Sequence, residues 1–137
     1  MKLVLACGCF DVLHPGHIAH LCTARELGTH LWIALTVASA VNKGPGRPLF
    51  HWDERADALR ALRCVNRVVE NWNAAETIAW VQPDIYVKGI EYRDQDIPER
   101  AVCEELGIEL VFLDTKPVYS STRIMNGEMW RERVKAA

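Results

Sequence analysis

Residues 3–17 read LVLACGCFDVLHPGH, and this stretch decides the fold. Residues 3–7 are apolar throughout, which is typical of a strand buried on both faces of a parallel sheet. The glycine-containing turn that follows leads directly into a helix. Free backbone N–H groups and the helix dipole favour an anion at such a turn, so the stretch predicts both an α/β fold and a site.

The rest of the chain repeats this alternation. We expect one helix to end at Gly28, one before Pro83 and one at Gly107. Asp53 is the expected cap of the second helix. The alternation predicts right-handed crossovers and a Rossmann-like three-layer α/β/α domain with a parallel five-stranded sheet, its ligand at the carboxyl ends of the strands. The expected strands cover residues 3–7, 31–35, 68–69, 85–87 and 108–113, and the helices lie around residues 18–27, 54–65, 78–81 and 102–106.

Composition limits the class of protein. The 137 residues are 50% apolar and 25% charged, which excludes disorder, collagen and coiled coil and predicts one domain over residues 1–137. The net charge of −2 argues against nucleic acid, so any phosphate contact must be local. A short apolar N-terminus predicts neither export nor a membrane span, and five scattered cysteines predict reduced thiols in the cytoplasm.

Two histidines, His14 and His17, flank Pro15 and Gly16 in the first turn. Neutral imidazoles donate hydrogen bonds to phosphate oxygens without a permanent buried charge, and Gly16 lets the backbone approach a ligand closely. The turn has neither the G-x-G-x-x-G pattern of dinucleotide-binding folds nor the G-x-x-x-x-G-K-[ST] pattern of P-loops. We favour a phosphate-binding turn over two unrelated polar histidines.

A second motif lies about a hundred residues further on, where residues 119–124 read YSSTRI. With GCFDVLHPGH at residues 8–17, it resembles the G-x-F-D-x-x-H-x-G-H and I-S-S-T-[RK]-I motifs of the cytidylyltransferase-like nucleotidyltransferases. The resemblance covers nearly the whole chain. Residues 43–50 (KGPGRPLF) and 83–92 (PDIYVKGIEY) are most similar to the adenylyltransferase half of bifunctional ADP-heptose synthases and related sugar-phosphate nucleotidyltransferases.

The resemblance implies the reaction. Members transfer a nucleoside monophosphate from a nucleoside triphosphate to a phosphorylated acceptor and release pyrophosphate. The chain is therefore expected to be an enzyme that uses ATP, with Mg²⁺ bound to the triphosphate rather than to assigned side chains, and a sugar phosphate. The attacking phosphate is already ionised, so the site needs positioned donors rather than a strong base.

The resemblance also implies roles for individual residues. The catalytic group, expected to contact the reacting phosphates, is His14, His17, Lys43 and Arg123. The nucleotide-binding group is Gly8, Cys9, Phe10, Asp11, Gly16, Lys88, Gly89, Ser120, Ser121 and Thr122. The substrate-binding group is Arg55, Arg63, Glu91 and Tyr92.

Some of these assignments leave alternatives open. Arg55 and Arg63 lie eight positions apart on one expected helix, where they either face phosphate or are solvated surface arginines. Asp11 either orients the histidine turn or helps to hold Mg²⁺, and we favour the orienting role. Residues 36–40 read TVASA where relatives commonly carry an acidic residue after the second strand, so the acceptor's identity stays open.

Three other functions remain as alternatives. The first is a CTP-dependent enzyme of the glycerol-3-phosphate cytidylyltransferase type, and the second is a non-catalytic nucleotide-binding regulator. The third is a metal or redox module, because cysteines and histidines crowd residues 7–22, but no C-x-x-C is present, and Cys7 and Cys22 are expected in the core. We also expect a homodimer, since a small chain has little surface to enclose a site.

Overall fold

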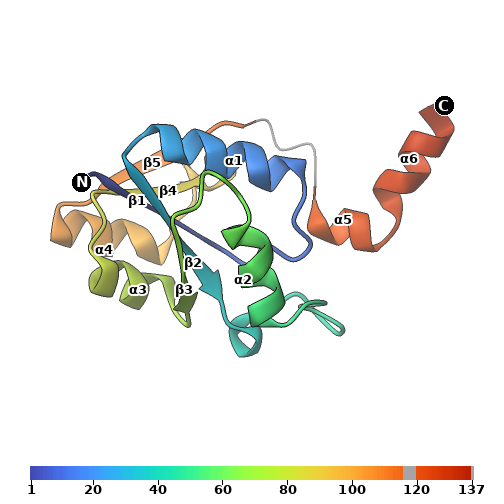
Figure 1. Ribbon diagram of the computed structural model, residues 1–137, viewed down its shortest axis with the longest axis horizontal. Helices are drawn as coiled ribbons and strands as arrows, with labels where there is room; N and C mark the ends of the chain where they lie inside the picture. Colours follow the sequence, from blue (N-terminus) through green and yellow to red (C-terminus); the bar gives the residue numbers. More distant parts are fainter. Residues whose placement is uncertain (116–119, 137) are drawn as a thin grey trace.

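The computed structural model describes residues 1–115 and 120–136 and is built on a parallel sheet (Figure 1). Its strand order is β3-β2-β1-β4-β5, which confirms the Rossmann-like prediction. Tyr119, the first residue of the expected second motif, lies outside the described residues. The strands are β1 (Leu3–Gly8), β2 (His30–Thr36), β3 (Arg67–Asn71), β4 (Ile85–Gly89) and β5 (Glu109–Leu113).

Four helices cover the two faces of the sheet. Neighbouring residues of one strand pack on opposite faces: Val68 joins the cluster that contains Leu21 and Leu59, and Val69 joins the cluster that contains Ile78 and Cys103. The strands are therefore buried on both sides, as their continuous apolar runs predicted. The helices are α1 (Pro15–Glu26) and α2 (Trp52–Arg60) on the first face, and α3 (Ala74–Val81) and α4 (Pro98–Leu106) on the second.

Short elements connect and extend these layers. Two single turns of 3₁₀ helix, η1 (Ala38–Ala40) and η2 (Ile90–Tyr92), follow β2 and β4. The chain ends in α5 (Ser121–Met125) and α6 (Glu128–Ala136), and α6 points away from the sheet without burying any residue (Figure 1). None of the described helices is long and apolar enough to span a membrane.

The second helix is where the sequence prediction was wrong in detail. Asp53 lies in its first turn, and His51 is the N-cap residue, with its backbone N–H donating to the Glu54 carboxylate at 3.1 Å. The helix ends at Arg60, and residues 61–64 form turns. The apolar side chains of Leu62, Cys64 and Val65 still pack against the core. By contrast, the fourth helix ends as predicted at Gly107, in the left-handed conformation at φ +69°.

The cysteines divide between core and surface. Cys7 packs against the cluster beneath α3 and α4, as expected. Cys22 is exposed, so its expected core position is wrong: α1 buries Leu21 and Ala24, and the next helical position after Leu21 rotates away from that face. None of the five cysteines forms a disulfide.

The sheet order fixes where a ligand can enter. The connections that leave β1 and β4 run in opposite directions along the sheet, with α1 on one face and α4 on the other. A crevice forms outside the carboxyl ends of two such strands, because the loops that follow them diverge. The first motif follows β1, so the fold brings it to this crevice.

Candidate active site

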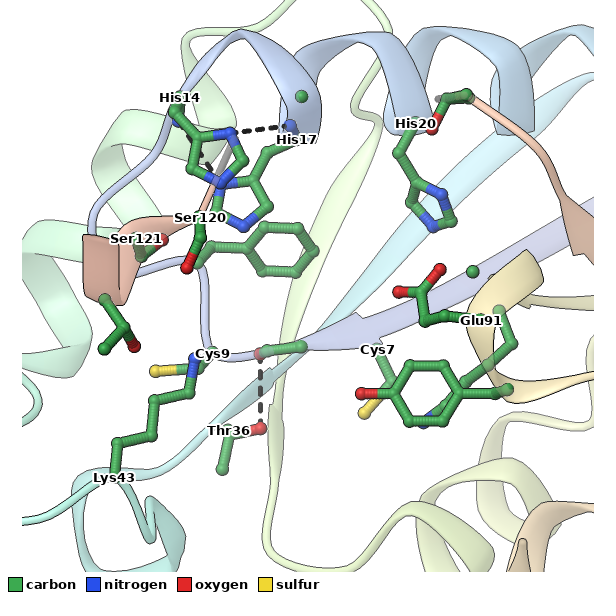
Figure 2. A pocket seen from close by; sticks show the side chains of 18 of the residues that line it. Cys7, Cys9, His14, His17, His20, Thr36, Lys43, Glu91, Ser120 and Ser121 are labelled. Atoms are coloured by element: carbon green, nitrogen blue, oxygen red, sulfur yellow. Dashed lines mark hydrogen bonds between the residues drawn. The ribbon is translucent and has the colours of Figure 1, made fainter. Parts of the chain in front are cut away.

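A pocket of about 540 Å³ lies at the carboxyl ends of β1 and β4. Its walls come from the turn after β1, the end of β4 with η2, and residues 120–122, so the two distant motifs meet in it (Figure 2). The predicted site residues that line it are Gly8, Cys9, Phe10, His14, Gly16, His17, Lys43, Lys88, Gly89, Glu91, Tyr92, Ser120, Ser121 and Thr122.

We name the two ends of this pocket by their residues. The histidine end contains His14, His17, Lys43 and residues 120–122. The Lys88 end contains His20, Lys88, Glu91, Tyr92 and Glu99. In Figure 2, His14, His17, Lys43, Ser120 and Ser121 lie on the left, and His20 and Glu91 lie on the right.

His14 and His17 hold each other in a defined tautomer. The Nδ1 atom of His14 accepts the backbone N–H of His17 at 3.3 Å, and the Nδ1 atom of His17 accepts that of His14 at 3.2 Å (Figure 2). Their rings stack with centroids 3.7 Å apart. Because each Nδ1 is an acceptor, the ring proton of each neutral imidazole is on Nε2. The arrangement therefore caps α1 and supplies two imidazole donors to one wall.

Burial keeps both imidazoles neutral. It lowers the pKa of His17 to about 3, with smaller contributions from His14, Lys43 and His20, and burial followed by the charge of Lys43 also lowers the pKa of His14. Lys43 comes from the loop after η1, is exposed, and has no carboxylate partner within residues 1–115 and 120–136. The histidine end thus combines neutral donors with a cation that no carboxylate of the described residues balances.

The second motif is tied to the first by its hydroxyl groups. Ser121 Oγ donates to the Val12 carbonyl oxygen at 2.7 Å, across 109 positions of sequence. Thr122 Oγ1 accepts from Arg47 Nη1 at 3.2 Å, and Ser120 Oγ accepts the Arg123 N–H at 3.3 Å. The Ser121 bond holds the start of α5 against the histidine turn, the Arg47 bond connects Thr122 to the loop before α2, and the Ser120 bond caps α5 itself.

Asp11 organises the loop and does not reach the pocket. Its carboxylate is fully buried and accepts the N–H groups of Leu49 at 2.7 Å and Phe50 at 3.1 Å, and Arg47 Nε at 3.3 Å. These donors occupy both oxygens and connect Asp11 to residues 47–50, an arrangement compatible with the orienting role that we favoured. The carboxylate does not line the pocket, and the nucleotide contact expected of Asp11 stays a prediction.

Arg55 and Arg63 also lie outside this pocket. Arg55 is 2% exposed, and its guanidinium donates to the carbonyl oxygens of Phe50, Cys9 and Thr36 at 3.0, 3.0 and 2.8 Å. It joins three loops beneath the site. Arg63 is exposed in the turns beyond the end of α2, so the pair does not share a helix.

Two further cations are engaged with carboxylates. Arg123 pairs with Glu128 at 3.1 Å and with Glu132, both in α6, and does not line the pocket, contrary to its expected catalytic position. Lys88 does line it, but its Nζ donates to Glu99 Oε1 at 2.9 Å. The charge of Lys88 is therefore already balanced by a carboxylate.

The sequence prediction missed several lining residues, among them His20, Thr36 and Glu99. His20 lies one helical turn after His17, so helical spacing could have placed it in the wall. It faces Glu91 across the pocket (Figure 2), and burial lowers its pKa although the charge of Glu91 acts in the opposite direction. Thr36 ends β2 at the ligand edge, a position that the fold predicts. No sequence signal distinguishes Glu99 from the other acidic residues near it.

The segment that lacks the expected acid is partly in the wall. Thr36 Oγ1 donates to the Gly8 carbonyl oxygen at 3.2 Å, and residues 38–40 form η1, which is exposed and outside the lining.

Over the part of the chain that the structure describes, no group of three His, Cys, Asp or Glu side chains could hold a metal ion.

Comparison with known proteins identifies the family to which the chain belongs. Residues 5–127 match the cytidylyltransferase-like protein family. A curated relative, the bifunctional protein HldE of Gluconobacter oxydans, is 36% identical over 92% of this chain and 27% of its own length, and HldE of Magnetococcus marinus is 42% identical over 70% and 20%. The chain thus spans about a quarter of the length of these relatives.

Two solved structures have a similar fold. A lipopolysaccharide core biosynthesis protein from Thermoplasma volcanium superposes with a TM-score of 0.71 at 26% identity, covering 83% of this chain and 97% of that one. Pantothenate synthetase from Thermus thermophilus also gives 0.71, at 16% identity over 97% of this chain and 64% of its own, and so supports the fold alone.

Proposed function

The chain belongs to the cytidylyltransferase-like family and is a nucleotidyltransferase, and from that premise we propose that it transfers AMP from MgATP to a sugar 1-phosphate of the heptose type. The products are an ADP-sugar and pyrophosphate. The observation that carries the proposal is the histidine end of the pocket. There His14 and His17, with their ring protons on Nε2, and Lys43, which has no carboxylate partner among the described residues, meet the second motif. The HldE relatives favour a sugar phosphate as the acceptor.

The chemistry requires positioning and charge stabilisation. An oxygen of the sugar phosphate attacks the α-phosphorus of ATP, the bond between the α-phosphorus and its bridging oxygen to the β-phosphate breaks, and pyrophosphate leaves. His14 and His17 donate to the oxygens of the reacting phosphoryl group, and Lys43 balances charge on the triphosphate. No proton has to be removed from the ionised nucleophile, which agrees with imidazoles that are neutral donors.

Magnesium enters as part of the substrate. The one buried carboxylate of the motif loop, Asp11, is already occupied by N–H donors and by Arg47, so it does not offer a ligand. Mg²⁺ usually keeps several waters and binds through substrate phosphates with few protein ligands. The phosphate oxygens of ATP therefore carry the metal into the site.

The test is a pyrophosphate-release assay with a matrix of substrates. ATP and CTP are each combined with heptose 1-phosphate, a hexose 1-phosphate and glycerol 3-phosphate in the presence of Mg²⁺. We expect the fastest release with ATP and a sugar 1-phosphate. Release only with CTP and glycerol 3-phosphate would replace this function by the cytidylyltransferase alternative, and nucleotide binding without release for every pair would indicate a regulator.

A further inference from the structure

The Lys88 end of the pocket holds an ion pair that the phosphate chemistry does not use. Lys88 comes from β4 and Glu99 from the first turn of α4, and their side chains are 20% and 5% exposed. The ammonium group lies 2.9 Å from Glu99 Oε1 and 4.6 Å from the centre of the Tyr92 ring. Its charge is therefore already balanced on the side that faces α4.

Glu99 has one oxygen engaged and the other open to a ligand. Oε1 accepts both Lys88 Nζ and the Tyr86 hydroxyl, the latter at 3.4 Å. Burial raises the pKa of Tyr86, so its hydroxyl stays protonated and remains a donor. Oε2 has no hydrogen-bond partner among the described residues, and Glu99 lines the pocket.

The negative charge of Glu99 determines which kind of ligand group can bind at the Lys88 end. A buried carboxylate repels a phosphate, and a lysine that is already paired gives little compensation. A hydroxyl group instead donates to the open carboxylate oxygen without bringing charge, and hydrogen bonds to charged groups are stronger than neutral ones. A second carboxylate, that of Glu91, faces His20 at this end and adds to its negative charge (Figure 2).

We propose that Glu99 is a specificity-determining residue that binds a sugar hydroxyl group through Oε2 and, by pairing with Lys88, keeps this end from accepting a second phosphate. The proposal rests on the proposed function, which supplies two sugars: that of the acceptor and the ribose of ATP. Both offer the same chemistry. The experiment separates them by measuring each ligand alone.

The test compares the dissociation constants of the wild-type protein and the Glu99→Gln variant by calorimetry. The probes are heptose 1-phosphate, MgATP and pyrophosphate, the last of which carries no sugar. We expect the variant to bind one of the two sugar-bearing probes about tenfold more weakly, and that probe identifies the sugar. Pyrophosphate should bind equally well or more tightly, because Lys88 loses its counter-charge.

Controls keep the result specific to this carboxylate. Glu105→Gln removes the same charge from an exposed position of the same helix and should leave all three constants unchanged. If Glu99→Gln does not fold, Glu99→Asp keeps the charge but withdraws the carboxylate, and should weaken the same probe.

Two outcomes would overturn the proposal. Unchanged binding of both sugar-bearing probes would show that Glu99 does not contact a sugar. An equal loss for all three probes would show a merely structural role. Neither outcome depends on turnover, so they remain distinct from a failure of the proposed function, which would appear as no pyrophosphate release by the wild-type enzyme.

Discussion

The histidine end and the Lys88 end of the pocket differ in how their charges are balanced. At the histidine end, Lys43 has no carboxylate partner in the described part of the chain, and the imidazoles of His14 and His17 are neutral donors. At the Lys88 end, the cation is paired with Glu99. The comparison teaches that a lysine in a pocket marks an anion site only where its charge is not already balanced.

This difference explains how a chain with a net charge of −2 can still have a site suited to an anion. Attraction for a polyanion does not need a basic protein when a few donors are left without counter-charges at one place. Other cations near the site are engaged elsewhere: Arg47 with Asp11, and Arg123 with the carboxylates of α6. Under the proposed function, local pairing, more than the number of basic residues, therefore decides where we expect phosphate to bind.

The largest effect should come from removing one donor of the histidine end. His17→Ala should lower kcat by roughly 10²–10³, the usual loss for one preorganised donor, while the protein stays folded. The measurement is steady-state pyrophosphate release with ATP and a sugar 1-phosphate. His30→Ala, at the opposite edge of the sheet, is the control and should keep its activity. Near-normal turnover of the His17 variant would contradict the role of the histidine end as the source of catalytic donors.

The next effect concerns the buried ion pair beneath the histidine end. Asp11→Asn removes the charge that holds Arg47 and the N–H groups of Leu49 and Phe50, and should lower the free energy of unfolding by about 2 kcal/mol. Urea denaturation measures it. Asp57→Asn, which removes an exposed carboxylate, should change stability by less than about 0.5 kcal/mol. Equal stability of the two variants would mean that Asp11 does not organise the loop.

A third experiment sets the two lysines against each other. Lys43→Met should weaken pyrophosphate binding about tenfold, because it removes an unbalanced charge. The double variant Lys88→Met/Glu99→Gln removes one charge of each sign and should bind pyrophosphate as the wild type does. Calorimetric titration gives both constants. A larger loss in the double variant would reverse the roles of the two ends.

The last effect is a pH dependence of stability, which does not bear on activity. The folded-state pKa of His17 is about 3 and its unfolded value is near 6.5, so below pH 6.5 the unfolded chain binds a proton that the folded chain does not. Its stabilising contribution is complete above pH 6.5 and is lost as the pH falls. His17→Asn should therefore reduce the fall in unfolding free energy between pH 7 and pH 5, by at most about 1.4 kcal/mol per pH unit. Identical slopes in urea denaturation would contradict the buried neutral imidazole.

Much of this molecule can be predicted from its sequence, because its strands are continuous apolar runs and its first motif follows a strand. These two facts predict the sheet, the end of the strands at which the pocket lies and the position of His14 and His17 in its wall. The second motif then meets the first, as their shared lining of the pocket shows.

What could not be predicted is where charged side chains find their partners. Arg55 was expected either to face phosphate or to be a solvated surface residue, and only the fold reveals that three carbonyl groups converge on its guanidinium. Glu99 and Lys88 are eleven positions apart, and Arg47 and Asp11 are thirty-six apart. Such pairs depend on the packing of separate elements, about which local sequence carries no information.

The central claim, transfer of AMP rather than of another part of ATP, is tested most directly by following two labels. The enzyme is given a sugar 1-phosphate with ATP that carries ³²P at the α-position or at the γ-position. The α-label should appear in the ADP-sugar and the γ-label in pyrophosphate, and both should require the sugar phosphate. Transfer of the γ-label to the sugar phosphate, or its release as inorganic phosphate, would contradict the account.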